Sequence, residues 1–445
     1  MDRIFVPVLY LYAIIPRLST ADVIRRFLSA FLVAYSLLEK GELIVIEIIS
    51  EGGITSAVGF TAGSTYAGLK TEAGVPDLGI VLSDRPANSA ATFTTNSIES
   101  PSVTASRERK TAVTSRGIVA NSGCANCSVG PQGLTDAEEL ASLAGTHTGV
   151  SGKDLYVAST GMIGVELPMA LIRQNITNIV LSDEGGTDFA KSIMTTDSKH
   201  KERAVSFKHD GKTVTLGGSA KGVGMIHPNM ATMLCFITTD ADVDAKFLQE
   251  ALSEAVSLSF NMIDVDGDQS TNDSVIVLAN GASGTAQIDA DSEGSDNFVE
   301  ALRYVCTELA KELARDGEGA QRLIEVIVEG AHTTEDAQKA AREIASSSLV
   351  KAMVHGKDPN WGRLVMALGK SSIPLKEGEI DIFISDIHIV HEGIAIPYLK
   401  DAVVSAMNSE QVDFRISLNV GECSATAWGC DLTEEYVIFN SAYST

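Results

Sequence analysis

Apolar residues recur every three to four positions in several parts of this chain, the period of a helix with one buried face. Residues 244–260 and 297–314 both show this pattern. Their predicted buried faces are Phe247, Leu248, Ala251, Leu252, Ala255 and Val256 in the first, and Phe298, Leu302, Val305, Cys306 and Leu309 in the second. Residues 334–346 form a third predicted helix. Thr135 and Glu138 form a capping box, which predicts a helix that begins there and runs through Leu143.

Shorter apolar or alternating runs predict β-strands between these helices. They are residues 78–82, 117–121, 233–238, 323–328, 380–389 and 414–420. Strands and helices alternate along the chain without a convincing internal repeat. The pattern therefore predicts an α/β protein with mixed β-sheets sandwiched between helices and a smaller C-terminal α/β unit.

Residues 1–45 differ from the rest of the chain. They contain two apolar runs, 4–15 and 27–38, which are separated and followed by polar residues. Each run is shorter than the roughly 20 residues that a membrane-spanning helix needs. A membrane-associating helix, a cryptic signal, or translation from a start assigned too far upstream would each account for them. We favour the last and leave residues 1–45 out of the functional argument.

Composition narrows the classes of function. The 445 residues are 44 % hydrophobic and 21 % charged, with a net charge of −24. Such an acidic surface repels phosphate backbones and anionic lipids, so we expect neither nucleic-acid nor membrane partners. We also expect a cytoplasmic protein. The CxxC pair Cys124 and Cys127 lacks the second pair of a zinc site, and residues 264–268 lack the glycine position of an EF-hand. We expect no metal, and a turn with a polar network at 264–268.

A glycine-rich segment around Lys221 carries the densest chemistry. Lys221 is not followed by Ser or Thr, and Gly222 and Gly224 lack the third glycine of a dinucleotide fingerprint, so nucleotide-binding loops are excluded. Ala231 and Thr232 follow a turn and lead into an apolar strand. If the bond between them were cut, the new α-amine of Thr232 would titrate at about 7.7–8.0 and act as base for its own hydroxyl. By pattern alone, a glycine turn before a core strand fits equally well.

Seven blocks of this chain resemble, in the same order, the self-cleaving ornithine/glutamate N-acetyltransferases of arginine biosynthesis. They are residues 159–164, 221–234, 259–273, 316–319, 358–363, 427–433 and 440–445. The resemblance covers about residues 53–445. Cys124, Val223, His227 and Ser444 depart from the residues usual in that family. His227 bears on the rate of self-cleavage, and we interpret it as a partly exposed turn histidine.

The resemblance implies an N-terminal-nucleophile type of fold and a set of functional residues. It implies cleavage between Ala231 and Thr232, with Thr232 as the nucleophile. Thr160 and Gly161 would form the oxyanion hole, through a hydroxyl and a backbone N–H. The implied substrate-binding residues are Thr195, Lys221, Thr232, Glu318, Asn440 and Thr445.

By the same resemblance, cleavage would separate an alpha chain, residues 46–231, from a beta chain, residues 232–445, and the fragments would assemble as α₂β₂. The implied reaction moves an acetyl group from N²-acetylornithine to glutamate through an acetyl-Thr232 ester, without a metal or bound cofactor. Use of acetyl-CoA as a second donor stays open. Two alternatives also stay open: an N-terminal-nucleophile aminopeptidase or amidase, and an unprocessed amino-acid-binding protein.

Overall fold

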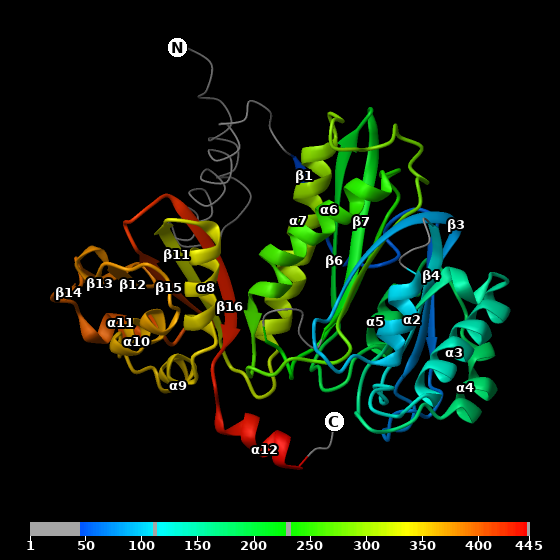
Figure 1. Cartoon of the computed structure of the whole chain (residues 1–445), viewed down its shortest axis with the longest axis horizontal. Helices are drawn as coiled ribbons and strands as arrows, with labels where there is room; N and C mark the ends of the chain where they lie inside the picture. The colour runs from blue at the N-terminus through cyan, green and yellow to red at the C-terminus, as the bar shows by residue number, and fades with distance from the viewer. Residues whose placement is uncertain (1–44, 110–113, 228–232, 443–445) are drawn as a thin grey trace, which may run out of the picture. The chain divides into compact units, whose positions relative to one another are not determined.

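The computed structural model describes residues 45–109, 114–227 and 233–442. The chain divides into two compact units, Met1–Val45 and Ile46–Thr445, and every described helix and strand belongs to the second. Two β-sheets organise this second unit (Figure 1). None of its described helices is both long enough and apolar enough to span a membrane.

The larger sheet has nine strands and mixes parallel with antiparallel pairs. Its order is β1-β6-β7-β8-β10-β3-β4-β5, and β2 also pairs with β3. The pairs β8–β10 and β4–β5 are parallel, and the others are antiparallel. The strands are β1 (Ile46–Ile49), β2 (Phe60–Thr65), β3 (Leu78–Phe93), β4 (Thr114–Asn121), β5 (Leu155–Ser159), β6 (Lys201–His209), β7 (Lys212–Lys221), β8 (Leu234–Thr239) and β10 (Ser274–Ala279).

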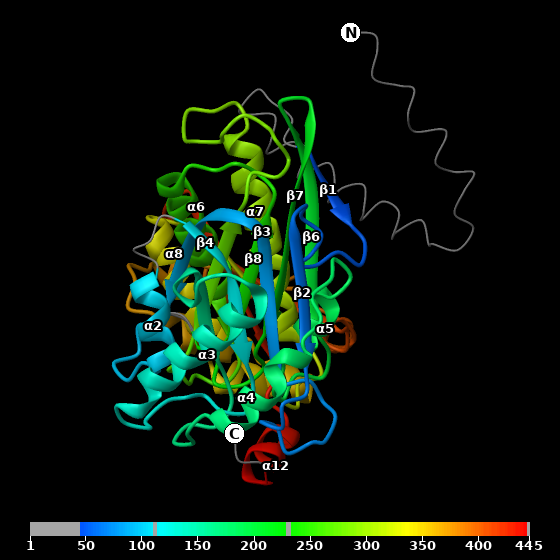
Figure 2. The ribbon, with the colours of Figure 1, turned by 90° about the vertical axis from the view of Figure 1, so that its right-hand side faces the viewer.

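Helices cover both faces of this sheet. They are α2 (Pro101–Arg109), α3 (Gln132–Thr148), α4 (Met169–Asn175), α5 (Gly186–Ser192), α6 (Ala245–Leu258) and α7 (Ser295–Arg315). Alternate residues of β8 point to opposite faces. Phe236 packs on Phe189 of α5, with ring centroids 5.7 Å apart, whereas Cys235 and Ile237 join the core formed with α6 and α7. Figure 2 shows α2, α3 and α4 as a layer in front of the strands.

The smaller sheet has seven strands in the order β14-β13-β12-β15-β11-β16-β9. They are β9 (Ile263–Asp264), β11 (Leu323–Ala331), β12 (Asp381–Ile384), β13 (Ile387–His391), β14 (Ile394–Ala395), β15 (Gln411–Ser417) and β16 (Cys423–Cys430). Its helices are α8 (Thr334–Ala345), α9 (Ser348–Gly356), α10 (Gly362–Lys370) and α11 (Lys400–Ala406), and α12 (Glu434–Ala442) follows β16. Helix α7 packs against strands of both sheets, so one cluster of buried apolar residues extends from the larger sheet into the smaller one.

Four single 3₁₀ turns complete the described elements. They are η2 (Gly152–Asp154), η3 (Ile176–Asn178), η4 (Phe260–Met262) and η5 (Glu377–Glu379). The expected α/β class with mixed sheets and covering helices is confirmed. The helices expected from apolar periodicity are also present. Helix α6 begins after Asp244, whose carboxylate accepts hydrogen bonds from the backbone N–H groups of Lys246 and Phe247, both at 3.0 Å.

Two local predictions were wrong. Helix α3 begins at Gln132, so Thr135 is already inside the helix and does not cap it; Pro131 stands at the N-cap and makes no side-chain capping bond. The proline ring fixes the φ of Pro131 at −63°, a helical value, and this favours the start of the helix at the next residue. Residues 380–389 are not one strand either. They form the hairpin of β12 and β13, because Ser385 turns the chain with a φ of 51°.

Candidate active site

A cavity of about 110 Å³ lies where the large sheet meets the loops after α5 and α7 and the C-terminal helix α12. Six residues expected to function in acetyl transfer line it together: Thr160, Gly161, Thr195, Lys221, Glu318 and Asn440. They come from segments far apart in the sequence. The other expected site residues, Ala231, Thr232 and Thr445, lie outside the described residues.

Thr160 and Gly161 follow the end of β5. The Thr160 N–H donates to the carbonyl oxygen of Asn121 at 3.0 Å, which continues the pairing of β4 with β5. Gly161 has a φ of 122°, and a Cβ there would come within 2.3 Å of the backbone carbon of Gly123. Only glycine fits this backbone conformation and this close approach. The Asn272 amide braces the same segment by donating to the Ser159 carbonyl oxygen at 2.8 Å.

Lys221 ends β7 and is 2 % exposed. Its ammonium donates to the hydroxyl oxygen of Thr160 at 3.2 Å. Burial lowers the pKa of Lys221, and the nearby carboxylates of Asp197 and Glu318 oppose that effect. Because a lysine can only donate, the Thr160 oxygen is the acceptor in this bond, and the O–H of Thr160 is left to donate elsewhere.

A buried ion cluster holds the loop after α5 and the backbone that directly follows Lys221. The Lys201 ammonium lies 2.7 Å from a carboxylate oxygen of Asp197 and 2.7 Å from one of Asp316. Asp197 also accepts hydrogen bonds from the N–H groups of Gly222 at 2.9 Å and Thr195 at 3.1 Å. Burial opposes ionisation of Asp197, but the lysines beside it keep its pKa below the ordinary value. The cluster therefore fixes two segments of the cavity wall as a charged, hydrogen-bonded unit.

Glu318 supplies a carboxylate to the opposite part of the wall. One of its oxygens accepts from the Thr196 hydroxyl at 2.7 Å, and the other accepts from the Asn440 amide at 2.8 Å. A Cβ on Gly224 would lie 2.6 Å from this carboxylate, so the glycine makes room for it. Glu318 is thus held in one orientation, and its bond to Asn440 ties α12 to the cavity.

Several cavity residues carry polar groups that the sequence interpretation assigned no role. Thr196, Asn272, Asp266 and Tyr436 are among the lining residues. The Tyr436 hydroxyl donates to Asp266 at 3.3 Å, and Asp266 accepts from the backbone N–H of Met225 at 2.6 Å. Burial raises the pKa of Asp266. Asn272 lies in the sequence block 259–273, which marked the region without indicating which side chain would reach the cavity.

The polar network expected around residues 264–268 is present. Asp264 is 1 % exposed and lies 2.9 Å from both the Lys351 ammonium and the Nδ1 atom of His227. The His227 side chain is 39 % exposed, in agreement with the interpretation of a partly exposed turn histidine. Farther along, Asp273 is buried, and its carboxylate accepts from the N–H of Met233 at 3.0 Å. Burial raises the pKa of Asp273 well above its ordinary value.

A larger cavity, of about 770 Å³, shares Gly161 and Thr195 with the first. Lys70 and Lys191 are among its lining residues. The Lys70 ammonium donates to the Pro76 carbonyl oxygen at 2.8 Å. Burial lowers the pKa of Lys70 to about 8, against the opposing effect of Asp77. This neighbouring space is therefore lined in part by basic side chains.

Comparison with known proteins places these residues in a family. A family model described as "ArgJ family" matches residues 61–445. The chain is 47 % identical over 397 residues to the arginine biosynthesis bifunctional protein ArgJ of Symbiobacterium thermophilum. The aligned region covers 88 % of this chain and 99 % of the relative. The chain belongs to the ArgJ family. The resemblance drawn from the seven blocks is confirmed, and with it the expected acyltransferase of arginine biosynthesis.

Two solved structures are also similar to this ArgJ-family chain. The ArgJ structure from Bacillus halodurans is 40 % identical, covers 47 % of this chain and 98 % of its own, and has a TM-score of 0.46. The ornithine acetyltransferase of Mycobacterium tuberculosis, solved with ornithine, is 31 % identical, covers 41 % of this chain and 98 % of its own, and has a TM-score of 0.39.

Proposed function

We propose that this chain moves an acetyl group from N²-acetylornithine to glutamate, with Thr232 as acyl carrier after cleavage of the Ala231–Thr232 bond. One observation carries the proposal: residues at six family positions, drawn from distant segments, line a single cavity. That cavity has a buried cation, Lys221, and an oriented carboxylate, Glu318. A cytoplasmic location accords with the biosynthetic reaction and is proposed with it.

The two charges suit the proposed donor. N²-acetylornithine carries an α-carboxylate and a side-chain ammonium, separated by a short aliphatic chain. Lys221 supplies a cation for the carboxylate, and Glu318 supplies a carboxylate for the ammonium. Both oxygens of Glu318 are already held by Thr196 and Asn440, so the side chain needs no reordering when an ammonium arrives.

The proposed chemistry is an acyl transfer in two halves. The α-amine of Thr232 takes the proton of its own hydroxyl as the oxygen attacks the acetyl carbonyl. The Thr160 hydroxyl and the Gly161 N–H donate to the developing alkoxide, each stabilising it by about 3 kcal/mol. Collapse breaks the acetyl–nitrogen bond, and the proton passes to ornithine as it leaves. The amine of glutamate then attacks the acetyl-Thr232 ester. The Thr232 amine takes the proton that this nitrogen loses and returns it to the Thr232 oxygen as the ester C–O bond breaks and N-acetylglutamate departs.

Cleavage need not separate the two fragments. Strand β7, before the proposed cut, pairs with β8, after it, from Leu216 opposite Thr239 to Lys221 opposite Leu234. Strand β10 is also inserted between β8 and β3. The fragments 46–231 and 232–445 would thus share one sheet and one core as a non-covalent unit. Assembly of two such units into α₂β₂ rests on the family resemblance alone.

N-terminal sequencing of the C-terminal fragment tests the nucleophile directly. We expect denaturing electrophoresis to show two fragments, of which the C-terminal one begins Thr-Met-Leu-Cys-Phe. The Thr232→Ala variant should run as one uncut chain without acetyl transfer. An active protein that runs as a single chain would refute the proposed cleavage. Ornithine release that does not depend on glutamate would instead favour an amidase.

The larger cavity favours a second donor, acetyl-CoA. Its volume of about 770 Å³ and its lysines Lys70 and Lys191 suit a long donor with phosphate groups, and Gly161 connects it to the smaller cavity. We propose that glutamate also accepts acetyl from acetyl-CoA here. Lys191→Ala should raise the KM for acetyl-CoA and leave the KM for N²-acetylornithine unchanged. If neither donor's KM changes, the larger cavity does not bind acetyl-CoA.

A further inference from the structure

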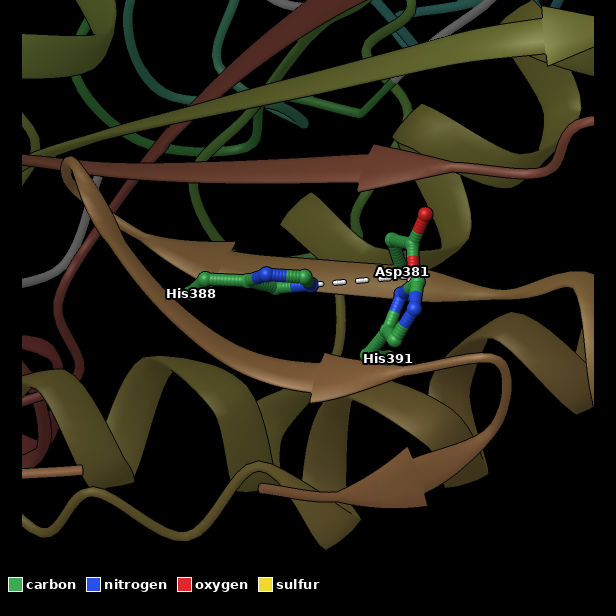
Figure 3. Close-up of side chains that lie close together, drawn as sticks. All are labelled: Asp381, His388 and His391. Atoms are coloured by element: carbon green, nitrogen blue, oxygen red, sulfur yellow. Dashed lines mark hydrogen bonds and ion pairs between the residues drawn. The ribbon is translucent and has the colours of Figure 1, made fainter. Parts of the chain in front are cut away.

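The β12–β13 hairpin places two histidines and an aspartate on one face of the smaller sheet (Figure 3). His388 and His391 are three positions apart, so a regular strand would point them to opposite faces. A β-bulge changes this. Phe383 pairs with His388, but the preceding Ile382 pairs with Val390, so Ile389 is an extra residue. Both Ile389 and Val390 are buried, which turns both histidines outward.

The outward face is where the three side chains meet. Asp381 and Phe383 alternate with the buried Ile382 and Ile384 along β12 and therefore share the face of the two histidines. An Asp381 oxygen lies 2.8 Å from Nδ1 of His391 and 3.6 Å from Nε2 of His388. One ligand atom from each residue lies within 4.8 Å of the others.

The separation between His388 and Asp381 distinguishes this group from a simple ion pair. At 3.6 Å it is too long for a hydrogen bond, and Nε2 of His388 is buried and has no hydrogen-bond partner within the described residues. Two ligand atoms bound to one tetrahedral Zn²⁺ ion lie about 3.3 Å apart, because each bond is about 2.0–2.1 Å long. The unpaired nitrogen thus lies at nearly the distance that a shared metal ion would require.

Neighbouring groups hold the ligands in place. The second carboxylate oxygen of Asp381 accepts from the Asn419 amide at 3.1 Å, and the Glu392 N–H donates to the first at 3.0 Å. The His388 ring stacks on Phe383 with centroids 4.2 Å apart, and the Arg415 guanidinium also lies over that phenyl ring. Such supporting contacts orient metal ligands and strengthen binding.

We propose that Asp381, His388 and His391 bind a divalent transition-metal ion such as Zn²⁺, through one carboxylate oxygen, Nε2 and Nδ1. Two imidazoles and one carboxylate are ligands typical of zinc and other divalent first-row transition metals, whereas calcium and magnesium prefer oxygen ligands alone. Binding through Nδ1 replaces the hydrogen bond between His391 and Asp381, and the imidazole proton is then carried on Nε2. Three protein ligands leave at least one position for water. The site shares no residue with the acetyl-transfer cavity, and the proposal is independent of the proposed function.

Titration of untagged, chelator-treated protein with Zn²⁺ tests the site. We expect one saturable ion per chain, with an affinity that falls at least tenfold in His388→Gln and in Asp381→Asn. His209→Gln is the matched control, because His209 is a histidine on the other sheet whose Nε2 atom lies 3.2 Å from the Ala286 carbonyl oxygen. Zn²⁺ should also raise the Tm of the wild type and not that of His388→Gln.

Co²⁺ reports the type of ligand in the wild-type protein, so this readout does not require any variant of the three ligands to fold. The absorption spectrum of the Co²⁺-loaded protein should show visible d–d bands of nitrogen and oxygen ligation and no thiolate charge-transfer band in the near ultraviolet. It should not change in Cys423→Ser, which removes the partly exposed thiol near His332. Absence of saturable binding, a thiolate band lost in Cys423→Ser, or unchanged affinity in folded His388→Gln would each overturn the proposal.

Discussion

The ammonium of Lys221 lies 3.2 Å from the hydroxyl oxygen of Thr160, and both side chains are almost fully buried. The Thr160 oxygen accepts a hydrogen bond from the lysine, so the Thr160 O–H is free to donate a hydrogen bond to a substrate oxygen. The ammonium that is hydrogen-bonded to the Thr160 oxygen polarises the hydroxyl, which makes the O–H a stronger hydrogen-bond donor to a developing alkoxide. This pair thereby links a proposed substrate-binding residue with a proposed oxyanion-hole residue.

Removal of the Thr160 hydroxyl should lower kcat with little effect on KM. Thr160→Val retains the shape but cannot donate, and loss of one oxyanion donor costs about 10²–10³ in kcat. Steady-state acetyl transfer measures the effect. Thr160→Ser is the matched control, because it restores the donor and should recover most of the rate. Equal activity of the valine and serine variants would exclude this role for the hydroxyl.

Neutralising Glu318 should separate the two substrates. Glu318→Gln removes the charge proposed to meet the ornithine ammonium, so the KM for N²-acetylornithine should rise about tenfold, as for one lost charged hydrogen bond. Glutamate has no side-chain ammonium, and its KM should not rise. Initial rates with each substrate varied in turn give both values. Glu434→Gln, on an exposed carboxylate of the same region, should change neither.

The backbone at Gly161 should not tolerate a side chain. Gly161→Ala places a methyl group within 2.3 Å of Gly123 at a φ of 122°, so the oxyanion segment must move. We expect acetyl transfer to fall more than 100-fold, the size of a lost oxyanion donor. Gly356→Ala, where a Cβ meets nothing within 4 Å, is the control and should retain activity. An active Gly161→Ala enzyme would contradict the assignment.

Loss of the Lys201 ammonium should strongly destabilise the protein. Lys201→Met leaves the buried carboxylates of Asp197 and Asp316 without their shared cation, and breaking a buried pair in this way costs about 3–5 kcal/mol in free energy of unfolding. Urea denaturation measures it. Lys339→Met removes a surface pair with Glu335 and should cost less than about 1 kcal/mol. Similar losses in both variants would mean that the buried cluster contributes no more to the free energy of unfolding than a surface ion pair does.

Lys70 should make stability depend on pH on the alkaline side. Its pKa is lowered from 10.5 to about 8 by burial, so between these values the unfolded chain binds a proton that the folded protein does not. The free energy of unfolding then rises with pH across that window. Lys70→Met should stabilise the protein by about 1–2 kcal/mol at pH 7 and progressively less toward pH 10.5. A difference between variant and wild type that is constant with pH would contradict the lowered pKa.

The helices and most strands were predictable from the amino-acid sequence. The apolar stripes of α6 and α7 face the core as their periodicity indicates, because burial of that stripe is what stabilises such helices. Predictions based on short motifs were weaker. The capping-box residue Thr135 lies inside α3 and not at its start. The apolar pattern of residues 380–389 gave no sign of the turn at Ser385, because the positive φ of that residue depends on the geometry of the hairpin and not on hydrophobicity.

The candidate side chains of the site were also available from the sequence, because the seven blocks specify residues and spacing. The sequence by itself therefore determined the ArgJ family, the α/β class and the groups that can take part in chemistry. Tertiary structure alone decided which of those groups meet. Lys221 reaches Thr160, and Asn440 reaches Glu318, only because β7, β5, α7 and α12 converge on one cavity. Packing between distant segments sets such distances, and no local pattern along the chain encodes them.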